Sequence, residues 1–137
     1  MNFVEGTVAR DPAGNAVFDA GEGIRVSLTP HAAERIASGG HAGKPLVMGF
    51  RPSAMSEQPI GKFAAQGGGN AVTMRTEVVE PLGEKIDVSC LTAAGQRLIA
   101  RVDARDGFPV GQPVKFHLDM EHVHVFEPGE FGRNITC

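Results

Sequence analysis

The sequence predicts an all-β fold, a small barrel of short antiparallel strands with one short helix. Apolar and polar residues alternate in several runs spaced about ten residues apart, which is typical of half-buried strands. The 137 residues include 18 Gly and 9 Pro, which is typical of a chain with many turns. At 14.4 kDa and 42% hydrophobic residues, the chain is large enough for one core. We therefore expect a single domain over residues 1–137.

The alternating runs are predicted to turn one face toward the core. Their inward sets are Ile24, Val26 and Leu28; Val72, Met74, Thr76 and Val78; Ile86, Val88 and Cys90; Leu98, Ala100 and Val102; and Val114, Phe116 and Leu118. Turn residues separate the runs at 81–83 and at 94–95. Residues 45–50 are instead apolar in succession, which is typical of a strand covered on both faces. Pro52 ends that run, because proline has no N–H to donate to a sheet.

One helix is predicted after the first alternating run. Thr29 can cap its amino end, and Pro30 suits the first helical position. Ala33, Ile36 and Ala37 would form its buried stripe, and two glycines would then end it. A helix of about ten residues is marginal alone, so we expect it to dock on the sheet.

Residues 52–69 have no alternation and contain several Pro and Gly residues, which predicts a mobile loop inserted in the barrel. The glycine-rich part of this stretch, 61–70, has no role that the sequence reveals. Eight or so short strands with one helix point to an OB-fold-like barrel rather than to a parallel α/β sheet.

Composition narrows the classes of function. With 13 basic and 16 acidic residues the net charge is −3, so the chain lacks the positive field that drives binding to nucleic acid. Trp and Tyr are absent, which leaves only Phe for stacking on bases. No apolar run approaches the length of a membrane span, so we expect no direct insertion into a membrane. Two cysteines and no visible secretory signal favour a reducing compartment.

The residues that could carry chemistry do not form a convincing site. The glycine triplet at 67–69 leads toward a strand rather than a helix with a Lys-Ser/Thr pair, so it is not interpreted as a phosphate loop. His122 and His124 could place two imidazoles on one face of a strand, but no rigid third metal ligand accompanies them. Cys90 falls on an inward face, where a thiol is usually inert. We expect no catalytic residue, cofactor site or metal site in this chain.

Arg51 stands between a buried strand and Pro52, which is unusual for a merely solvated guanidinium. It could pair with a carboxylate across a packing surface, or it could bind an oxyanion. The structural role is the preferred interpretation.

Several motifs occur in the order found in a known family. They are M-N-F-V-E-G at 1–6, L-V-M-G-F-R-P at 46–52, V-E-P-L-G at 79–83, G and L-I-A-R-V at 95 and 98–102, and H-V-F and G-R at 124–126 and 132–133. The ordered set resembles the C-terminal regulatory domain, of the TOBE or transport-associated OB type, of the ATP-binding subunit of ABC importers of the maltose and glycerol-3-phosphate class. Ser53, Val125 and Phe131 depart from the family pattern, which usually has Glu, Leu and Thr there.

The resemblance implies a non-catalytic regulatory and dimerisation domain, with ATP and Mg bound by an ATPase domain that this chain does not contain. The implied partners are a second copy of the subunit, the membrane subunits of a transporter for sugars or glycerol-3-phosphate-like solutes, and in some members a regulatory protein. The implied location is cytoplasmic, at the inner face of the cell membrane. The family-signature contact surface would comprise Gly49, Arg51, Pro52, Gly83, His124, Phe126 and Arg133.

Two alternatives come from other classes of function. A small-oxyanion-binding module, like the related barrels that hold molybdate between subunits, would use Arg51, Lys44 or backbone amides to meet the anion. A nucleic-acid-binding barrel would need basic and aromatic residues on one face, and the acidic balance counts against it.

Overall fold

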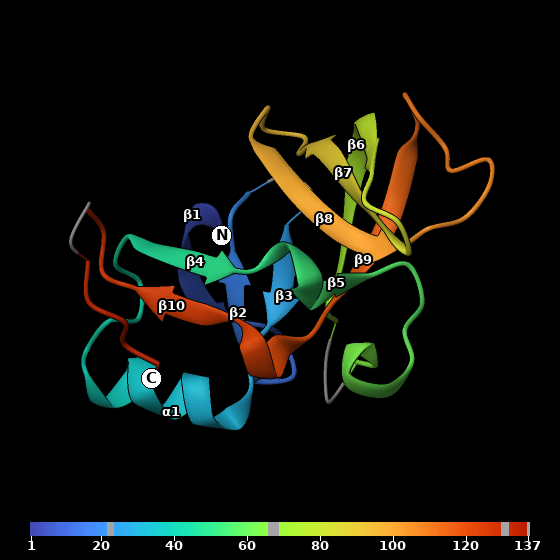
Figure 1. Cartoon of the computed structure of the whole chain (residues 1–137). Coiled ribbons are helices and arrows are strands. Elements are labelled where there is room, and N and C mark those ends of the chain that lie inside the picture. Colours follow the sequence, from blue (N-terminus) through green and yellow to red (C-terminus); the bar gives the residue numbers. More distant parts are fainter. Residues whose placement is uncertain (22–23, 66–68, 130–131, 137) are drawn as a thin grey trace.

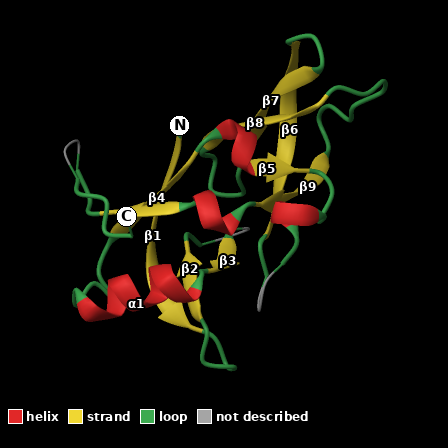
Figure 2. Ribbon diagram, turned by 60° about the horizontal axis from the view of Figure 1, so that its bottom comes forward, coloured by secondary structure: helices red, strands yellow, loops and turns green. Residues whose placement is uncertain are grey.

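The computed structural model describes residues 1–21, 24–65, 69–129 and 132–136 and contains two five-stranded antiparallel sheets that lie side by side (Figures 1 and 2). The first sheet has the order β10-β4-β1-β2-β3, and the second has the order β5-β9-β6-β7-β8. The strands are β1 (Asn2–Arg10), β2 (Ala16–Asp19), β3 (Arg25–Ser27), β4 (Leu46–Phe50), β5 (Met55–Ser56), β6 (Ala71–Pro81), β7 (Lys85–Leu91), β8 (Arg97–Asp103), β9 (Pro113–Leu118) and β10 (His124–Phe126).

The second sheet curls back on itself. Its two outer strands, β5 and β8, contact each other, and β8 also contacts the 3-10 helix η1 (Pro52–Ala54) that precedes β5. A β-bulge between Thr76 and Val78 sharpens the bend of the long strand β6. The result is a nearly closed barrel, as an all-β chain of short antiparallel strands predicts.

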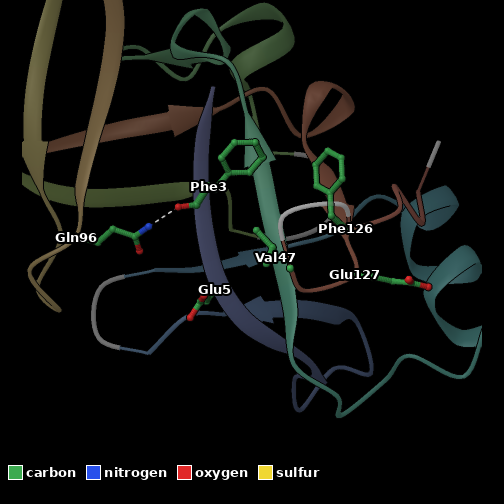
Figure 3. A pocket seen from close by; sticks show the side chains of 8 residues that line it. Phe3, Glu5, Val47, Gln96, Phe126 and Glu127 are labelled. Carbon is green, nitrogen blue, oxygen red and sulfur yellow. Dashed lines mark hydrogen bonds between the residues drawn. The ribbon is translucent and has the colours of Figure 1, made fainter.

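Hydrogen bonds at one end of β1 fasten the two sheets together. The buried amide of Asn2 donates from Nδ2 to the carbonyl of Ile99 at 2.7 Å and accepts at Oδ1 from the Ile99 N–H at 3.0 Å. The amide of Gln96 donates to the carbonyl of Phe3 (Figure 3). Asn2 thus satisfies both backbone groups of one β8 residue, as a neighbouring strand would.

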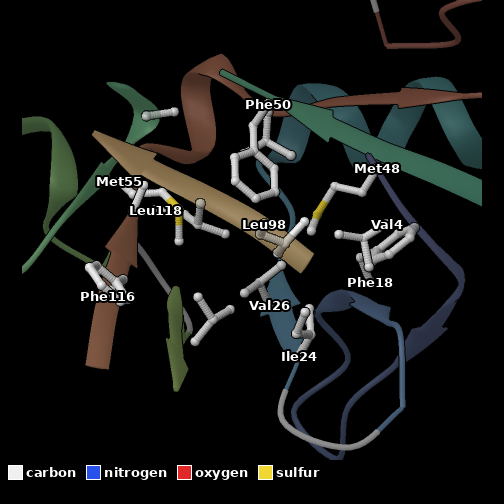
Figure 4. Close-up of a cluster of buried hydrophobic side chains, with 14 of the residues drawn as sticks. Val4, Phe18, Ile24, Val26, Met48, Phe50, Met55, Leu98, Phe116 and Leu118 are labelled. Atoms are coloured by element: carbon white, nitrogen blue, oxygen red, sulfur yellow. The ribbon is translucent and has the colours of Figure 1, made fainter. Parts of the chain in front are cut away.

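Both sheets contribute to one hydrophobic cluster (Figure 4). Phe18 and Phe50 enter it from the first sheet and Phe116 from the second, and all three rings are almost fully buried. The predicted inward sets at 86–90 and 98–102 are entirely buried, and β4 is apolar and largely buried on successive residues, as predicted. Ile24 and Val26 are also buried, with Leu28 half-buried beside them.

The predicted inward position of Val78 is wrong. Val72, Met74 and Thr76 face the core, and the Thr76 hydroxyl donates to the Pro109 carbonyl at 2.6 Å. The bulge that follows then inserts one extra residue, so that Val78 turns outward and is 57% exposed. A shift of one residue exchanges the two faces of a strand, and the apolar pattern alone does not reveal it.

The helix α1 (Pro30–Ser38) lies where the sequence predicts it. The Thr29 hydroxyl accepts from the Ala32 N–H at 3.2 Å, which caps the first turn. The predicted buried stripe is partly wrong, because Ala32 and Ile36 are buried whereas Ala37 is exposed. Ile36 joins the core cluster, so the helix is held by docking, as its short length requires.

The predicted loop over residues 52–69 is only partly correct. It contains η1, the strand β5 and a second 3-10 helix, η2 (Gly61–Phe63), and Met55 is fully buried in the core. Of its glycine-rich part, Gly69 accepts at its carbonyl from the Ser27 N–H at 2.8 Å, and residues 66–68 lie outside the described residues. The sequence analysis also missed β1 and β2, and it interpreted the start of β1 only as a family junction.

Candidate functional site

On three neighbouring strands of the first sheet, every second residue points away from the core. Phe3 in β1 lies opposite Gly49 in β4, which lies opposite His124 in β10. The next outward row consists of Glu5, Val47 and Phe126. The residues between them, among them Val4, Met48 and Val125, face the core. We call these six outward residues (Phe3, Glu5, Val47, Gly49, His124 and Phe126) the outer face.

Gly49 allows two aromatic rings to meet across β4. A Cβ at this position would lie 2.8 Å from the Phe126 ring and 3.1 Å from the Phe3 ring. Without one, the two rings pack edge to face, with centroids 6.0 Å apart and planes at 72°. The His124 ring lies edge-on to Phe126 on the other side, at 6.5 Å between centroids. The missing side chain is therefore what makes an aromatic surface possible here.

A groove of about 580 Å³ lies against this surface (Figure 3). It is lined by Phe3, Glu5, Val47, Gln96, Phe126, Glu127, Gly129 and Gly132, and we call it the aromatic groove. One of the large apolar side chains of its lining, Phe3, is 51% exposed to solvent, which is unusual for a phenylalanine. Its acidic members are Glu5 and Glu127, and Glu127 forms an ion pair with Arg133 at 3.2 Å. Such an arrangement can bind an apolar surface, and nothing in it provides a nucleophile with a base.

The structure brings most of the predicted contact residues to this part of the molecule. Gly49, His124 and Phe126 belong to the outer face, and Arg133 pairs with Glu127 in the lining of the aromatic groove. Arg51 and Pro52 follow directly after β4.

Gly83 lies elsewhere, in the turn between β6 and β7, where its φ of +85° favours glycine. The structure therefore does not bring Gly83 together with the other signature residues.

Sequence reasoning missed Phe3, Val47, Gln96 and Glu127. For Phe3 and Glu5 a signal was available, because residues 2–6 alternate in the way a strand does. For Gln96 there was none, since its bond to Phe3 joins residues that are 93 positions apart.

Arg51 does not have the structural partner that was preferred for it. Its side chain is exposed and pairs with no carboxylate of the described residues. It lines a second cavity, of about 460 Å³, with Met1, Ser53, Ala54, Lys62, Asp119, His122 and His124. We call this cavity the basic pocket. Lys44, the other cation named for an oxyanion, is not among its lining residues.

Cys90 and the histidines were the other candidates for chemistry. Burial raises the pKa of the Cys90 thiol to about 12, so it stays protonated and is a poor nucleophile. Within the described part of the chain, no three His, Cys, Asp or Glu side chains are grouped as metal ligands would be. His122 instead bonds through Nδ1 to the Asp119 carboxylate, at 2.6 Å from Oδ2.

Comparison with known families identifies this barrel. The model described as "TOBE domain" matches residues 41–126, which include β4, the second sheet and β10. The chain belongs to the TOBE domain family. A model described as "MalK OB fold domain" matches residues 1–55 of the same TOBE domain, which covers the first sheet except β10. The predicted OB-fold-like barrel is thereby confirmed.

Two individual proteins extend the comparison of this TOBE domain. An uncharacterized ABC transporter ATP-binding protein of Bacillus subtilis (strain 168), YurJ, is 25% identical to it over 127 residues, which are 93% of this chain and 33% of YurJ. The chain thus spans about a third of this relative. A solved structure of ModG, a cytoplasmic molybdate-binding protein, superposes with a TM-score of 0.66 at 19% identity, covering 93% of this chain and 96% of ModG. At that identity the likeness concerns the fold.

These findings confirm that the chain is a TOBE-type OB domain, and they show its similarity to part of an ABC transporter ATP-binding protein. Membership of this family also supports a non-catalytic role for the chain itself. Among the described residues, no helix is long and apolar enough to cross a lipid bilayer.

Proposed function

We propose that this TOBE domain is the regulatory and dimerisation domain of an ABC importer, and that it pairs with a second copy of itself through the outer face. The open aromatic surface of Phe3 and Phe126 beside Gly49 is the observation that carries the proposal. Phe3 is 51% exposed and Phe126 is half-buried, and the exposed part of such rings gains free energy when a partner covers it. A two-fold contact uses the same patch on both partners, so one such face serves the whole dimer.

The rest of the proposal concerns the full protein. An ATPase domain outside this chain would bind ATP and Mg and would hydrolyse the nucleotide. The paired TOBE domains would keep two ATP-binding subunits together while their ATPase domains separate and close, which raises the effective concentration of each for the other. The subunits would lie in the cytoplasm against the membrane subunits of the transporter, and a regulatory protein could use the same domain. The resemblance stated above favours sugars or glycerol-3-phosphate-like compounds as the solute.

Sedimentation equilibrium of the purified chain tests the proposed pairing. Replacing Phe3 or Phe126 by Ser should weaken self-association about tenfold or more, because each removes a large apolar contact. Ile60→Ser is the matched control, since Ile60 is 69% exposed and lies in the segment before η2, outside the outer face. A chain that stays monomeric at millimolar concentration, or an equal loss with Ile60→Ser, would contradict pairing through this face.

The class of solute needs a separate measurement. Cells that lack the full subunit should lose uptake of one labelled compound, a sugar or glycerol 3-phosphate, and should regain it when the subunit is restored. Normal uptake of both classes without the subunit would contradict this part of the proposal and leave the pairing measurement unaffected.

A further inference from the structure

The basic pocket lies where three short 3-10 helices come near the end of β4. Arg51 and Ser53 come from the start of η1, and Lys62 from η2. Asp119 precedes the third 3-10 helix, η3 (Met120–His122), His122 ends it, and His124 begins β10. Segments that are far apart in the sequence therefore converge on one cavity. The aromatic groove has none of these residues in its lining.

The two cations of the basic pocket form no ion pair, although the Asp119 carboxylate lines the same pocket. Neither Arg51 nor Lys62 forms an ion pair with any residue that the structure describes, and Lys62 only stacks on the Phe63 ring at 5.3 Å. On the outward side of β7 and β8, by contrast, Lys85 and Arg101 each pair with a carboxylate on the opposite strand. Two cations without an ion-pair partner in one cavity attract an anion.

The Asp119 carboxylate needs a hydrogen-bond donor, which a fully ionised anion does not have. It lines the pocket, yet its side chain is only 1% exposed. His122 holds Oδ2 at 2.6 Å, whereas Oδ1 is buried and has no hydrogen-bond partner among the described residues. An unpaired buried carboxylate oxygen is costly, and a ligand that brings a hydrogen-bond donor would remove that cost.

We propose that the basic pocket binds a phosphate group that still carries a proton, either as inorganic phosphate or as a phosphate monoester. Arg51 and Lys62 neutralise the phosphate oxygens, because guanidinium and ammonium groups form their strongest bonds with oxyanions. The P–O–H group donates to Oδ1 of Asp119, which requires the carboxyl group to turn toward the cavity, because this oxygen is fully buried in the structure. At pH 6.5 about a quarter of a phosphate monoester still carries this proton, because its second pKa is about 6, and every inorganic phosphate ion carries at least one.

The carboxylate makes this site selective. Sulfate and molybdate have no proton at that pH, so they would place their lone pairs against Oδ1 of Asp119 instead of a donor. The pocket should therefore favour phosphate over both anions, although all of them are tetrahedral oxyanions. The basic pocket shares only His124 with the outer face, and this inference concerns a ligand that the single chain can bind without the proposed pairing.

Isothermal titration calorimetry of the full chain in a phosphate-free buffer at pH 6.5 tests the site. Inorganic phosphate should bind about tenfold or more tightly than sulfate or molybdate, which is the scale of one hydrogen bond to a charged group. Glycerol 3-phosphate serves as the monoester probe, and tighter binding of either phosphate compound supports the proposal and shows which source fits better. No heat with any phosphate compound at 10-millimolar scale, or equal affinity for sulfate, would overturn it.

Variants locate the binding. Arg51→Ala should weaken phosphate binding about tenfold or more, whereas Lys44→Ala, a matched cation outside the pocket, should leave it unchanged. Asp119→Asn should raise sulfate affinity relative to phosphate, because the amide can donate to a fully ionised oxyanion. Equal losses with Arg51→Ala and Lys44→Ala would show nonspecific charge attraction and overturn the site. If Asp119→Asn fails to fold, the phosphate-to-sulfate ratio of the unmodified chain still decides.

Sedimentation of the same variants separates this inference from the proposed function. Arg51→Ala should keep the self-association of the unmodified chain, so that loss of phosphate binding with unchanged association supports a separate ligand site. Simultaneous loss of both would show that the variant disrupts the surface as a whole and would overturn Arg51 as a specific ligand residue.

Discussion

The outward sides of the two sheets differ in how they meet solvent. On β7 and β8, opposite charges lie directly across the strands, as in the pairs Asp87–Arg101 and Lys85–Asp103. The Arg101 guanidinium bonds to Asp87 through two nitrogens and holds the pKa of that carboxyl below its usual value. On β10, β4 and β1 the outward positions carry the exposed ring of Phe3, half-buried rings at 124 and 126, Val47, Gly49 and a single charged residue, Glu5. The charged side chains on β7 and β8 are paired and stable in contact with water. The aromatic side chains of the first sheet gain free energy when a partner covers them.

Asn2 connects the two sheets, and truncating its side chain should have the largest effect on stability. Asn2→Ala leaves the N–H and the carbonyl of Ile99 without these two partners in a part-buried place at the edge of the second sheet. We expect a loss of about 2–4 kcal/mol in the free energy of unfolding, measured by urea titration. Ser89→Ala on β7, a strand residue with no hydrogen bond from its side chain among the described contacts, should cost far less. Equal costs would mean that Asn2 does not join the sheets.

Gly49→Val tests the aromatic side alone. Its new Cβ would push the Phe126 and Phe3 rings apart, which should cost about 1–2 kcal/mol of stability and disturb any contact made by the outer face. Val47→Ile adds only one methyl group beside Phe126 on the same strand, so it should cost less stability than Gly49→Val. The comparison uses urea unfolding with sedimentation. A fully stable Gly49→Val variant with unchanged association would show that the rings do not need the open position.

Arg101→Met tests the charged side and should have a smaller effect. Its pair with Asp87 is solvent-exposed, and such pairs contribute little to stability because water and salt screen them. We expect a small shift in the urea midpoint, no change in sedimentation, and a pKa of Asp87 that returns toward its ordinary value in an NMR titration. A loss of self-association in this variant would remove the contrast between the two sides.

The smallest expected effect concerns pH. Burial, followed by the charge of Lys115, lowers the pKa of His117 from its ordinary value of 6.5. The unfolded chain therefore takes up this proton first, so stability should fall as the pH drops through about 6.5 and should not change on this account above it. His117→Gln should flatten that decline between pH 7.5 and 5 in urea titrations, while His31→Gln on the exposed side of α1 should not. An identical decline in both variants would contradict a role for His117.

The alternating strands and the helix could be predicted because their signals are local. Ile86, Val88 and Cys90 repeat with period two, and Thr29 with Pro30 marks the start of α1. The prediction that Val78 faces inward was wrong because a bulge changes the register of a strand without changing its apolar pattern.

The candidate site was less predictable. The resemblance named Gly49 and Phe126, but the reason for the glycine appears only when Phe3, 46 positions earlier in the chain, is seen beside it. The basic pocket was out of reach for the same cause, since Arg51, Lys62 and Asp119 come together only through the fold. Physical chemistry of single residues predicts elements, whereas a site of this kind depends on contacts between distant segments.

The bidentate amide of Asn2 has a mechanical consequence. The side chain grips β8 while the backbone of the same residue pairs with Phe50 in β4. A force applied at Met1 would therefore act on both sheets at once instead of peeling one strand from the edge of a single sheet. Hydrogen bonds that share a load must break together, so this end of the molecule is stiff. A displacement of Met1 would therefore move the two sheets as one body.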